Sequence, residues 1–154
     1  MPPLYVDTSA LVKRYVPEIG AAWVRRTLAR PTIQVIYTSV IAQPEVLSAL
    51  QRKVREGQLT PAEALRRGQR VTTHFLWRYR LLTITPSVLA QACALVQAYP
   101  LRAYDALHLA CALAVRQRLQ YHGAPGLRFV AADTALLAAA RAEGFLVDNP
   151  LLYP

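Results

Sequence analysis

The chain has 154 residues, of which 54% are hydrophobic, which suits one domain spanning residues 1–154 and excludes a disordered chain. No uncharged stretch reads as a membrane span and no signal peptide opens the sequence, so we expect a cytoplasmic protein with no membrane partner. The formal net charge is +9, and all but two of the eighteen basic residues are arginine. This excess predicts a polyanionic partner; the alternative is a basic surface that only keeps the protein soluble.

The first strand and the residue after it organise the chain. The apolar run 4–6 predicts a short strand that stops at Asp7, and a helix over 9–15 follows, which Pro17 ends. In an open α/β sheet, ligands bind at the carboxyl ends of the strands, so the Asp7 carboxylate is expected to point into a site. Its alternative role is a helix N-cap.

Further strands and helices alternate along the rest of the chain. Residues 20–29 predict a helix and residues 33–37 a strand, after which Thr38 and Ser39 can cap a helix that breaks near Gly57. The later elements predicted are a helix from Pro61 to about Phe75 or Trp77, a strand over 81–84, a helix from Pro86 to near Tyr99, a helix over about 102–119, a loop over 123–126, a strand over 127–131, a helix over 134–143 closed by Gly144, and a strand over 145–147. This order predicts an α/β fold in which helices cover both faces of a central parallel sheet of four to five strands.

Two further features concern the interior. The helix over about 102–119 is apolar almost all round, which is typical of a buried helix. Cys93 and Cys111 each lie in an Ala/Leu-rich segment, so we expect two buried thiols and neither a disulfide scaffold nor a zinc site.

Four of the nine acidic residues have apolar surroundings. Asp7 and Asp133 follow predicted strands, whereas Glu45 and Asp105 lie in the first turns of helices that are otherwise apolar on one side. Each alone could cap a helix or complement a helix dipole, the latter worth about 0.3–1 kcal/mol. If all four converge, like charges about 4 Å apart repel by roughly 4 kcal/mol per pair at an effective dielectric of 20, so a cation is expected among them.

Carboxylate oxygens favour Mg²⁺ or Mn²⁺, and no His/Cys cluster competes for zinc. Beside Asp7, the hydroxyl of Thr8 or Ser9 could bond to that carboxylate or to a phosphate, or could cap the helix. His108 lies on the same helical face as Asp105 and could touch a substrate. The interpretation we favour is a core histidine bonded to the backbone.

At these residues the chain resembles the PIN-domain ribonucleases, and among them the VapC toxins of prokaryotic toxin–antitoxin pairs. Four segments match that family's segments in order, and the match covers essentially the whole chain: YVDTSALVKRYVPEIGA, EVLSAL, RAYDALHLA and FVAADTALLAAA. The resemblance assigns catalysis and metal binding to four acids and places a supporting hydroxyl beside the first of them: Asp7, Glu45, Asp105 and Asp133, with Thr8 or Ser9.

The resemblance also implies a fold, an activity and partners. The fold is the three-layer PIN-like fold, and the activity is Mg²⁺- or Mn²⁺-dependent endonucleolytic cleavage of single-stranded or looped RNA. The partners are a small VapB-like antitoxin that covers the site and a second copy of the chain. Two features depart from the family pattern: Pro44, which could shift the start of the helix that carries Glu45, and a long loop over 121–127.

Basic residues near the acids are candidate RNA contacts. Five of them lie within about two helical turns of a site acid: Lys13, Arg14, Arg52, Lys53 and Arg102. For each one the alternative is an ordinary solvated surface position.

Three other functions compete with the nuclease. An aspartyl-phosphate phosphatase of the haloacid dehalogenase type needs a second Asp two residues after the first, and Ser9 occupies that position. A catalytically silent PIN-like protein would bind nucleic acid through the same charge without turnover. A structural protein would use the four acids only as helix caps.

Overall fold

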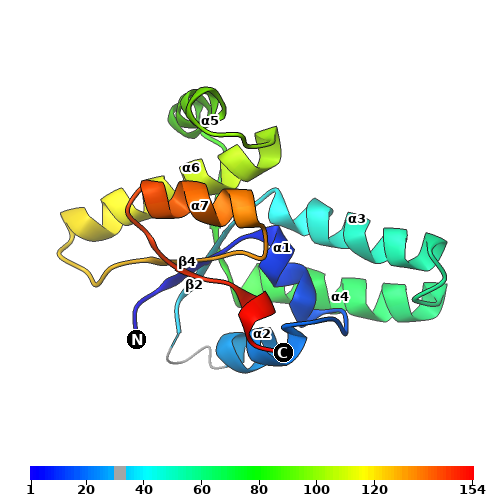
Figure 1. Ribbon diagram of the computed structural model, residues 1–154. Coiled ribbons are helices and arrows are strands. Elements are labelled where there is room, and N and C mark those ends of the chain that lie inside the picture. The colour runs from blue at the N-terminus through cyan, green and yellow to red at the C-terminus, as the bar shows by residue number, and fades with distance from the viewer. Residues whose placement is uncertain (30–33) are drawn as a thin grey trace.

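The computed structural model describes residues 1–29 and 34–154, and its strands form one parallel sheet (Figure 1). The strand order is β3-β2-β1-β4-β5, and every neighbouring pair is parallel. The strands are β1 (Leu4–Val6), β2 (Ile36–Ser39), β3 (Arg80–Leu82), β4 (Arg128–Val130) and β5 (Leu146–Asp148). The parallel sheet predicted from the alternation of elements is confirmed, with five strands.

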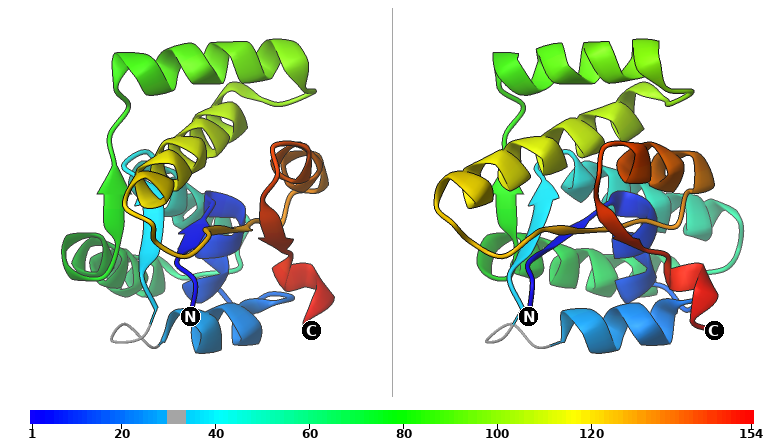
Figure 2. Two further views of the ribbon diagram at one scale, coloured as in Figure 1. Left: turned by 90° about the vertical axis from the view of Figure 1, so that its left-hand side faces the viewer. Right: turned by 60° about the vertical axis from the view of Figure 1, so that its left-hand side comes forward.

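Helices cover both faces of the sheet and give three layers (Figures 1 and 2). The layer of α5, α6 and α7 packs on one face, and the layer of α1 to α4 packs on the other. The helical elements are α1 (Thr8–Leu11), η1 (Val12–Arg14), α2 (Ala21–Leu28), α3 (Ala42–Arg55), α4 (Pro61–Trp77), α5 (Pro86–Ala98), α6 (Ala103–Tyr121), α7 (Thr134–Ala142) and η2 (Pro150–Leu152), of which η1 and η2 are 3₁₀ turns.

Strand β1 shows how the sheet separates two cores. Successive side chains of a strand point to opposite faces, so Leu4 and Val6 join the core under α1 to α4 while Tyr5 joins the core under α5 to α7. Tyr5 stacks on Phe129 of β4 with ring centroids 5.5 Å apart. All three residues of β1 are buried, which places Asp7 at the end of a strand in the middle of the sheet.

The interior helix predicted over about 102–119 is α6, which lies between α5 and the sheet (Figure 2). Cys111 on α6 is buried, as predicted, because it faces the sheet. The prediction for Cys93 was wrong: its thiol is exposed, because it lies on the outer side of α5. None of the described helices combines the length and hydropathy needed to cross a bilayer.

Strand β2 begins and ends later than the sequence suggested. The expected first residue, Ile33, lies outside the described residues, and Thr38 and Ser39 are the last residues of the strand, not helix caps. The buried Thr38 hydroxyl donates to the carbonyl of Val6 at 2.8 Å, so its polar atom is satisfied within the sheet. The Ser39 hydroxyl accepts only a long bond of 3.4 Å from the amide of Ile41.

Helix α3 starts at Ala42 in spite of Pro44. Proline in the first turn removes an amide that has no intrahelical acceptor, so the helix loses no bond. Glu45 therefore keeps its place in the first turn of α3.

The segments before α2 and after β5 meet. Gly20 caps α2 with a φ of +84°, and a Cβ there would lie 2.5 Å from the carbonyl oxygen of Pro150 in η2. Trp23 of α2 stacks on Tyr153 with ring centroids 4.9 Å apart. Asp148 ends β5 and accepts two bonds of 2.9 Å from the Arg128 guanidinium.

Candidate active site at the carboxyl edge of the sheet

Asp7 lies directly after β1 and is almost completely buried. Its carboxylate accepts bonds from the Ser9 amide at 3.0 Å and the Ser9 hydroxyl at 2.5 Å, so Asp7 is the N-cap of α1. The capping role and the position at the strand end, which the sequence offered as alternatives, therefore occur together.

Ser9 connects this cap to a distant segment. Its hydroxyl also accepts a bond of 2.9 Å from the amide of Ala132, in the loop between β4 and α7. In that loop Asp133 caps α7 by accepting the Leu136 amide at 2.8 Å. The ends of β1 and β4 are neighbours in the sheet, so Asp7 and Asp133 emerge at the same edge.

Glu45 reaches this edge from the first turn of α3. Its carboxylate accepts a bond of 2.9 Å from the Thr8 hydroxyl and a bond of 2.8 Å from Nε2 of His108. The same nitrogen lies 3.6 Å from an Asp7 oxygen. His108 thus joins the carboxylates that follow β1 and β2.

His108 is buried and bonded to side chains, so the expectation of a backbone partner was wrong. Nδ1 shares a hydrogen bond of 3.0 Å with the hydroxyl of Tyr5, which fixes the orientation of the ring. Burial acts to lower the pKa of His108, but the carboxylates of Asp7 and Glu45 outweigh it and raise the pKa above its ordinary value. The ring therefore lies between the two acids as a shared polar partner.

Asp105 and Asp133 are joined by Arg102. The Arg102 guanidinium donates to Asp105 at 3.3 Å and lies 4.0 Å from an oxygen of Asp133, while its own side chain is 83% exposed. Burial and the nearby charge of Asp7 raise the pKa of Asp105. Arg102 thus stands at the mouth of the site with its charge open to solvent.

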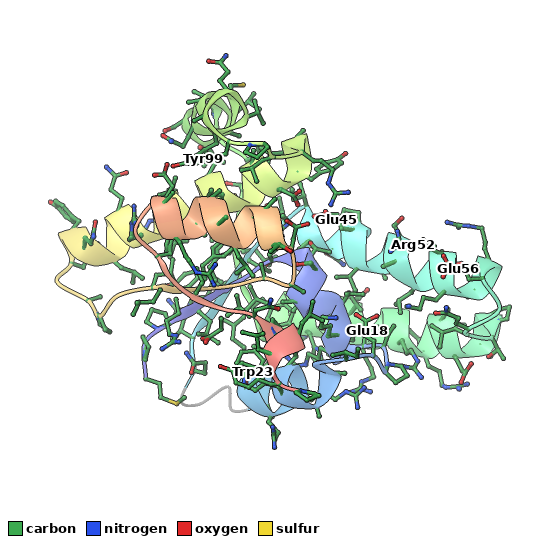
Figure 3. All side chains as sticks on the ribbon, viewed as in Figure 1. Glu18, Trp23, Glu45, Arg52, Glu56 and Tyr99 are labelled. Atoms are coloured by element: carbon green, nitrogen blue, oxygen red, sulfur yellow. The ribbon has the colours of Figure 1, made fainter. Side chains whose placement is uncertain are left out.

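The four predicted acids therefore gather at one edge as two pairs, one joined by His108 and the other by Arg102. The N-termini of α1, α3, α6 and α7 meet there (Figures 1 and 3), and their dipoles favour negative charge. However, within residues 1–29 and 34–154 no group of three His, Cys, Asp or Glu side chains has an arrangement that could hold a metal ion. The assignment of all four acids to one metal site therefore stays a prediction.

A groove of about 500 Å³ opens beside Glu45. Thr8, Ser9 and Glu45 form its polar end, and Ser48 and Ala49 leave it wide. Tyr104 on α6 lines it with a 60% exposed ring. Sequence reasoning missed Tyr104, although its position directly before Asp105 was a usable signal.

The predicted basic rim is only partly present. Arg52 lines the groove and the exposed Arg102 pairs with Asp105, but Lys13 is buried and its ammonium group donates to Glu18 at 2.9 Å. Lys53 lies 3.6 Å from the same carboxylate. Arg14 points away from the acids and donates to the hydroxyl of Tyr79 at 3.0 Å.

Comparison with known proteins identifies the family. The family model described as PIN domain matches residues 4–142. This chain belongs to the PIN domain family. Ribonuclease VapC49 of Mycobacterium tuberculosis is 34% identical over 154 residues, which cover 100% of both chains, so the chain also belongs with the VapC members of the family.

Solved structures of the family share the fold. Mycobacterium tuberculosis VapC20, described as a sarcin-ricin loop cleaving toxin, superposes with a TM-score of 0.62 at 18% identity, covering 93% of this chain and 96% of VapC20. A toxin-antitoxin complex from Klebsiella pneumoniae matches with a TM-score of 0.58 at 22% identity, covering 96% of this chain and 97% of that one. The three-layer PIN-like fold expected from the sequence is confirmed.

Proposed function

We propose that this protein is a metal-dependent endoribonuclease and the toxin of a toxin–antitoxin pair. The observation that carries the proposal is the meeting of Asp7, Glu45, Asp105 and Asp133 at the carboxyl edge of the sheet, beside an open groove. Membership of the PIN domain family and likeness to VapC ribonucleases support it. The reaction is hydrolysis of RNA phosphodiester bonds.

The donor chemistry of the site fits Mg²⁺ or Mn²⁺. Its acids offer hard carboxylate oxygens. The raised pKa of Asp105 shows that its surroundings disfavour a further negative charge, which a bound cation would offset. We assign the metal to the four acids: Asp7, Glu45, Asp105 and Asp133. A bound ion of this kind lowers the pKa of its water and neutralises charge on a phosphate.

The chain's own residues hold the reacting groups. The Ser9 and Thr8 hydroxyls donate to the Asp7 and Glu45 carboxylates and so hold these carboxylates in place. Arg102 offers an exposed guanidinium to a phosphate of the substrate. The groove beside Glu45 is wide enough to receive a nucleotide, and Tyr104 and Arg52 line it.

Partners follow from the same proposal. We expect a small VapB-like antitoxin to cover the groove, a homodimer of twice 17.1 kDa in light scattering, and action in the cytoplasm. A monomeric mass at high protein concentration would remove the dimer from the proposal and leave the nuclease untouched.

The test is metal-dependent cleavage of a structured RNA pool, read by sequencing the new RNA ends. The parent protein cuts in Mg²⁺ or Mn²⁺, and Asp7→Asn does not, because the amide is a poor metal ligand. The metal also raises the Tm of the parent and not that of Asp7→Asn. Glu56→Gln, which removes an exposed acid at the far end of α3 (Figure 3), cuts like the parent.

A second candidate is a catalytically silent PIN-like protein that binds nucleic acid. It is favoured by one observation: within the described ranges the acids already bond to helix amides, His108 and Arg102, and no group of three His, Cys, Asp or Glu side chains could hold a metal ion. RNA binding without metal-dependent cleavage, and no metal effect on the Tm, would select this candidate over the nuclease.

A further inference from the structure

A second groove, of about 600 Å³, lies away from the carboxylates, between η1, α2 and the first half of α4. In Figure 1, α2 and α4 lie on the side of the sheet opposite α6 and α7. Five arginines line this groove, and we name the set the arginine pocket: Arg14, Arg25, Arg66, Arg67 and Arg70. Only Arg14 was among the basic residues singled out from the sequence.

The positive charge of the arginine pocket is not neutralised by the protein. Throughout residues 1–29 and 34–154, none of the five guanidinium groups forms an ion pair within 4.0 Å. The one acid that lines the groove is Glu63, which caps α4, so five arginines face a single carboxylate and the pocket keeps a net positive charge.

Neutral acceptors hold several of these arginines in place. Arg14 donates to the hydroxyl of Tyr79 at 3.0 Å, and Arg67 donates to the carbonyl of Tyr15 at 2.5 Å. Arg25 makes a longer bond of 3.5 Å to the carbonyl of Val16. Such bonds orient a guanidinium group without cancelling its charge, so the pocket is arranged in advance for an anion.

The pKa of a neighbouring histidine, His74, is lowered by burial and in part by the positive charge of these arginines. His74 shares a hydrogen bond of 2.8 Å with the hydroxyl of Tyr15. Burial first, and then the charges of Arg14, Arg78 and Arg70, lower the pKa of His74 to about 4. The surroundings of the pocket therefore resist one more positive charge.

We propose that the arginine pocket binds the phosphate backbone of RNA at a distance from the bond that is cut. Guanidinium groups match phosphate oxygens in paired hydrogen bonds, and several together bind a polyanion by releasing its counterions. The proposal rests on the nuclease function and deepens it, because it gives the substrate a second point of attachment.

The position of the pocket favours RNA over an acidic protein segment. Val12 lines the groove beside Glu45, and Arg14 lines the arginine pocket, so the two grooves flank the same short 3₁₀ turn, η1. A strand bound in the groove beside Glu45 can therefore continue past this turn to the pocket. The pocket thus selects substrates that extend beyond the cleavage site.

The test measures the affinity of fluorescein-labelled oligouridylate of about sixteen nucleotides by fluorescence anisotropy, in chelator so that no cleavage occurs. Arg66→Gln/Arg70→Gln removes two exposed charges of the pocket, and Arg118→Gln/Arg141→Gln removes two exposed charges elsewhere. We expect the pocket variant to lose about tenfold in affinity and the control about twofold or less. Arg66→Lys/Arg70→Lys, which keeps the charge, retains most of the affinity.

A pocket variant that binds as tightly as the control variant would overturn the proposal. So would a polyglutamate peptide of equal length that binds the parent as tightly as the RNA and loses affinity in the same variant, since the pocket would then fit an acidic protein segment. In Mg²⁺ or Mn²⁺, the pocket variant raises KM for long RNA and leaves kcat unchanged. If neither the parent nor any variant cuts RNA but the pocket variant still binds it more weakly, the nuclease function is wrong and RNA binding by the arginine pocket is retained.

Discussion

His108 shows how one buried ring can organise a site. It contacts β1 through Tyr5, α1 through Thr8 and α3 through Glu45. Because these three residues come from separate parts of the chain, the ring fixes their relative positions. The sequence revealed only that His108 shares a helical face with Asp105; its partners depend on which strand lies beneath α6, and no local pattern specifies that.

The first prediction concerns the bond between His108 and Tyr5. His108→Leu leaves the Tyr5 hydroxyl and the Glu45 carboxylate without their imidazole partner, and we expect the free energy of unfolding to fall by about 2–4 kcal/mol. Adding Tyr5→Phe removes the stranded hydroxyl and restores about 1 kcal/mol. Urea denaturation measures both changes, and strictly additive losses in the double variant would contradict the pairing.

The second prediction concerns pH and His74. The pKa of this ring is lowered from its ordinary 6.5 to about 4 in the folded protein, so between these values the unfolded chain binds more protons. Stability is therefore present above pH 6.5 and is lost as the pH falls toward about 4.

His74→Gln does not titrate and can keep a bond to the Tyr15 hydroxyl. Between neutral pH and pH 4.5, we expect the stability loss measured by thermal unfolding to be about 1 kcal/mol smaller for His74→Gln than for the parent. The difference is modest because solvent screens the partly exposed ring. His122→Gln, which removes an exposed histidine at the end of α6, follows the parent. Equal losses in the parent and His74→Gln would exclude His74 as the titrating group.

At the scale of the element, the sequence predicted where most helices lie, but it predicted the ends of the strands less well. The capping box of Thr60 and Glu63 is present, because it is a local signal written within four residues. Strand β2 was misplaced because Thr38 suits both a cap and a strand, and its neighbours in the sheet decide between them. The bond between Asp148 and Arg128 likewise depends on which strands are adjacent in the sheet.

The third prediction uses two glycines with similar backbone conformations. Gly57 has a φ of +71° with open space around its Cβ position, so Gly57→Ala adds only backbone strain and costs about 1–2 kcal/mol. Gly20→Ala adds the clash with Pro150 and costs about 3 kcal/mol or more. Urea denaturation of both variants measures the difference, and equal losses would show that η2 moves aside freely.

At the scale of the whole molecule, the order of elements predicted the architecture well. Alternating strands and helices allow few arrangements, because parallel strands need crossover helices on the faces of the sheet. The sequence therefore indicated that the four acids share one edge, but not how they are spaced there. That spacing depends on Arg102 and His108, which divide the acids into two pairs.

The fourth prediction concerns the net charge of +9. If about five phosphates of single-stranded RNA are neutralised, raising the salt from about 50 to about 200 mM weakens binding about a hundredfold. A plot of log affinity against log salt concentration gives the slope. The buffer contains a metal chelator so that the RNA is not cleaved. A flat plot would remove the basic surface, including the arginine pocket, from RNA binding.

The capping roles of Asp7 and Asp133 have a practical consequence. An asparagine oxygen accepts the same backbone amides as an aspartate oxygen, so an Asn variant keeps the helix caps while weakening any metal site. Alanine would damage both at once. Asp7→Asn/Asp133→Asn should therefore serve as a folded, inert bait that retains uncut transcripts from a cell extract.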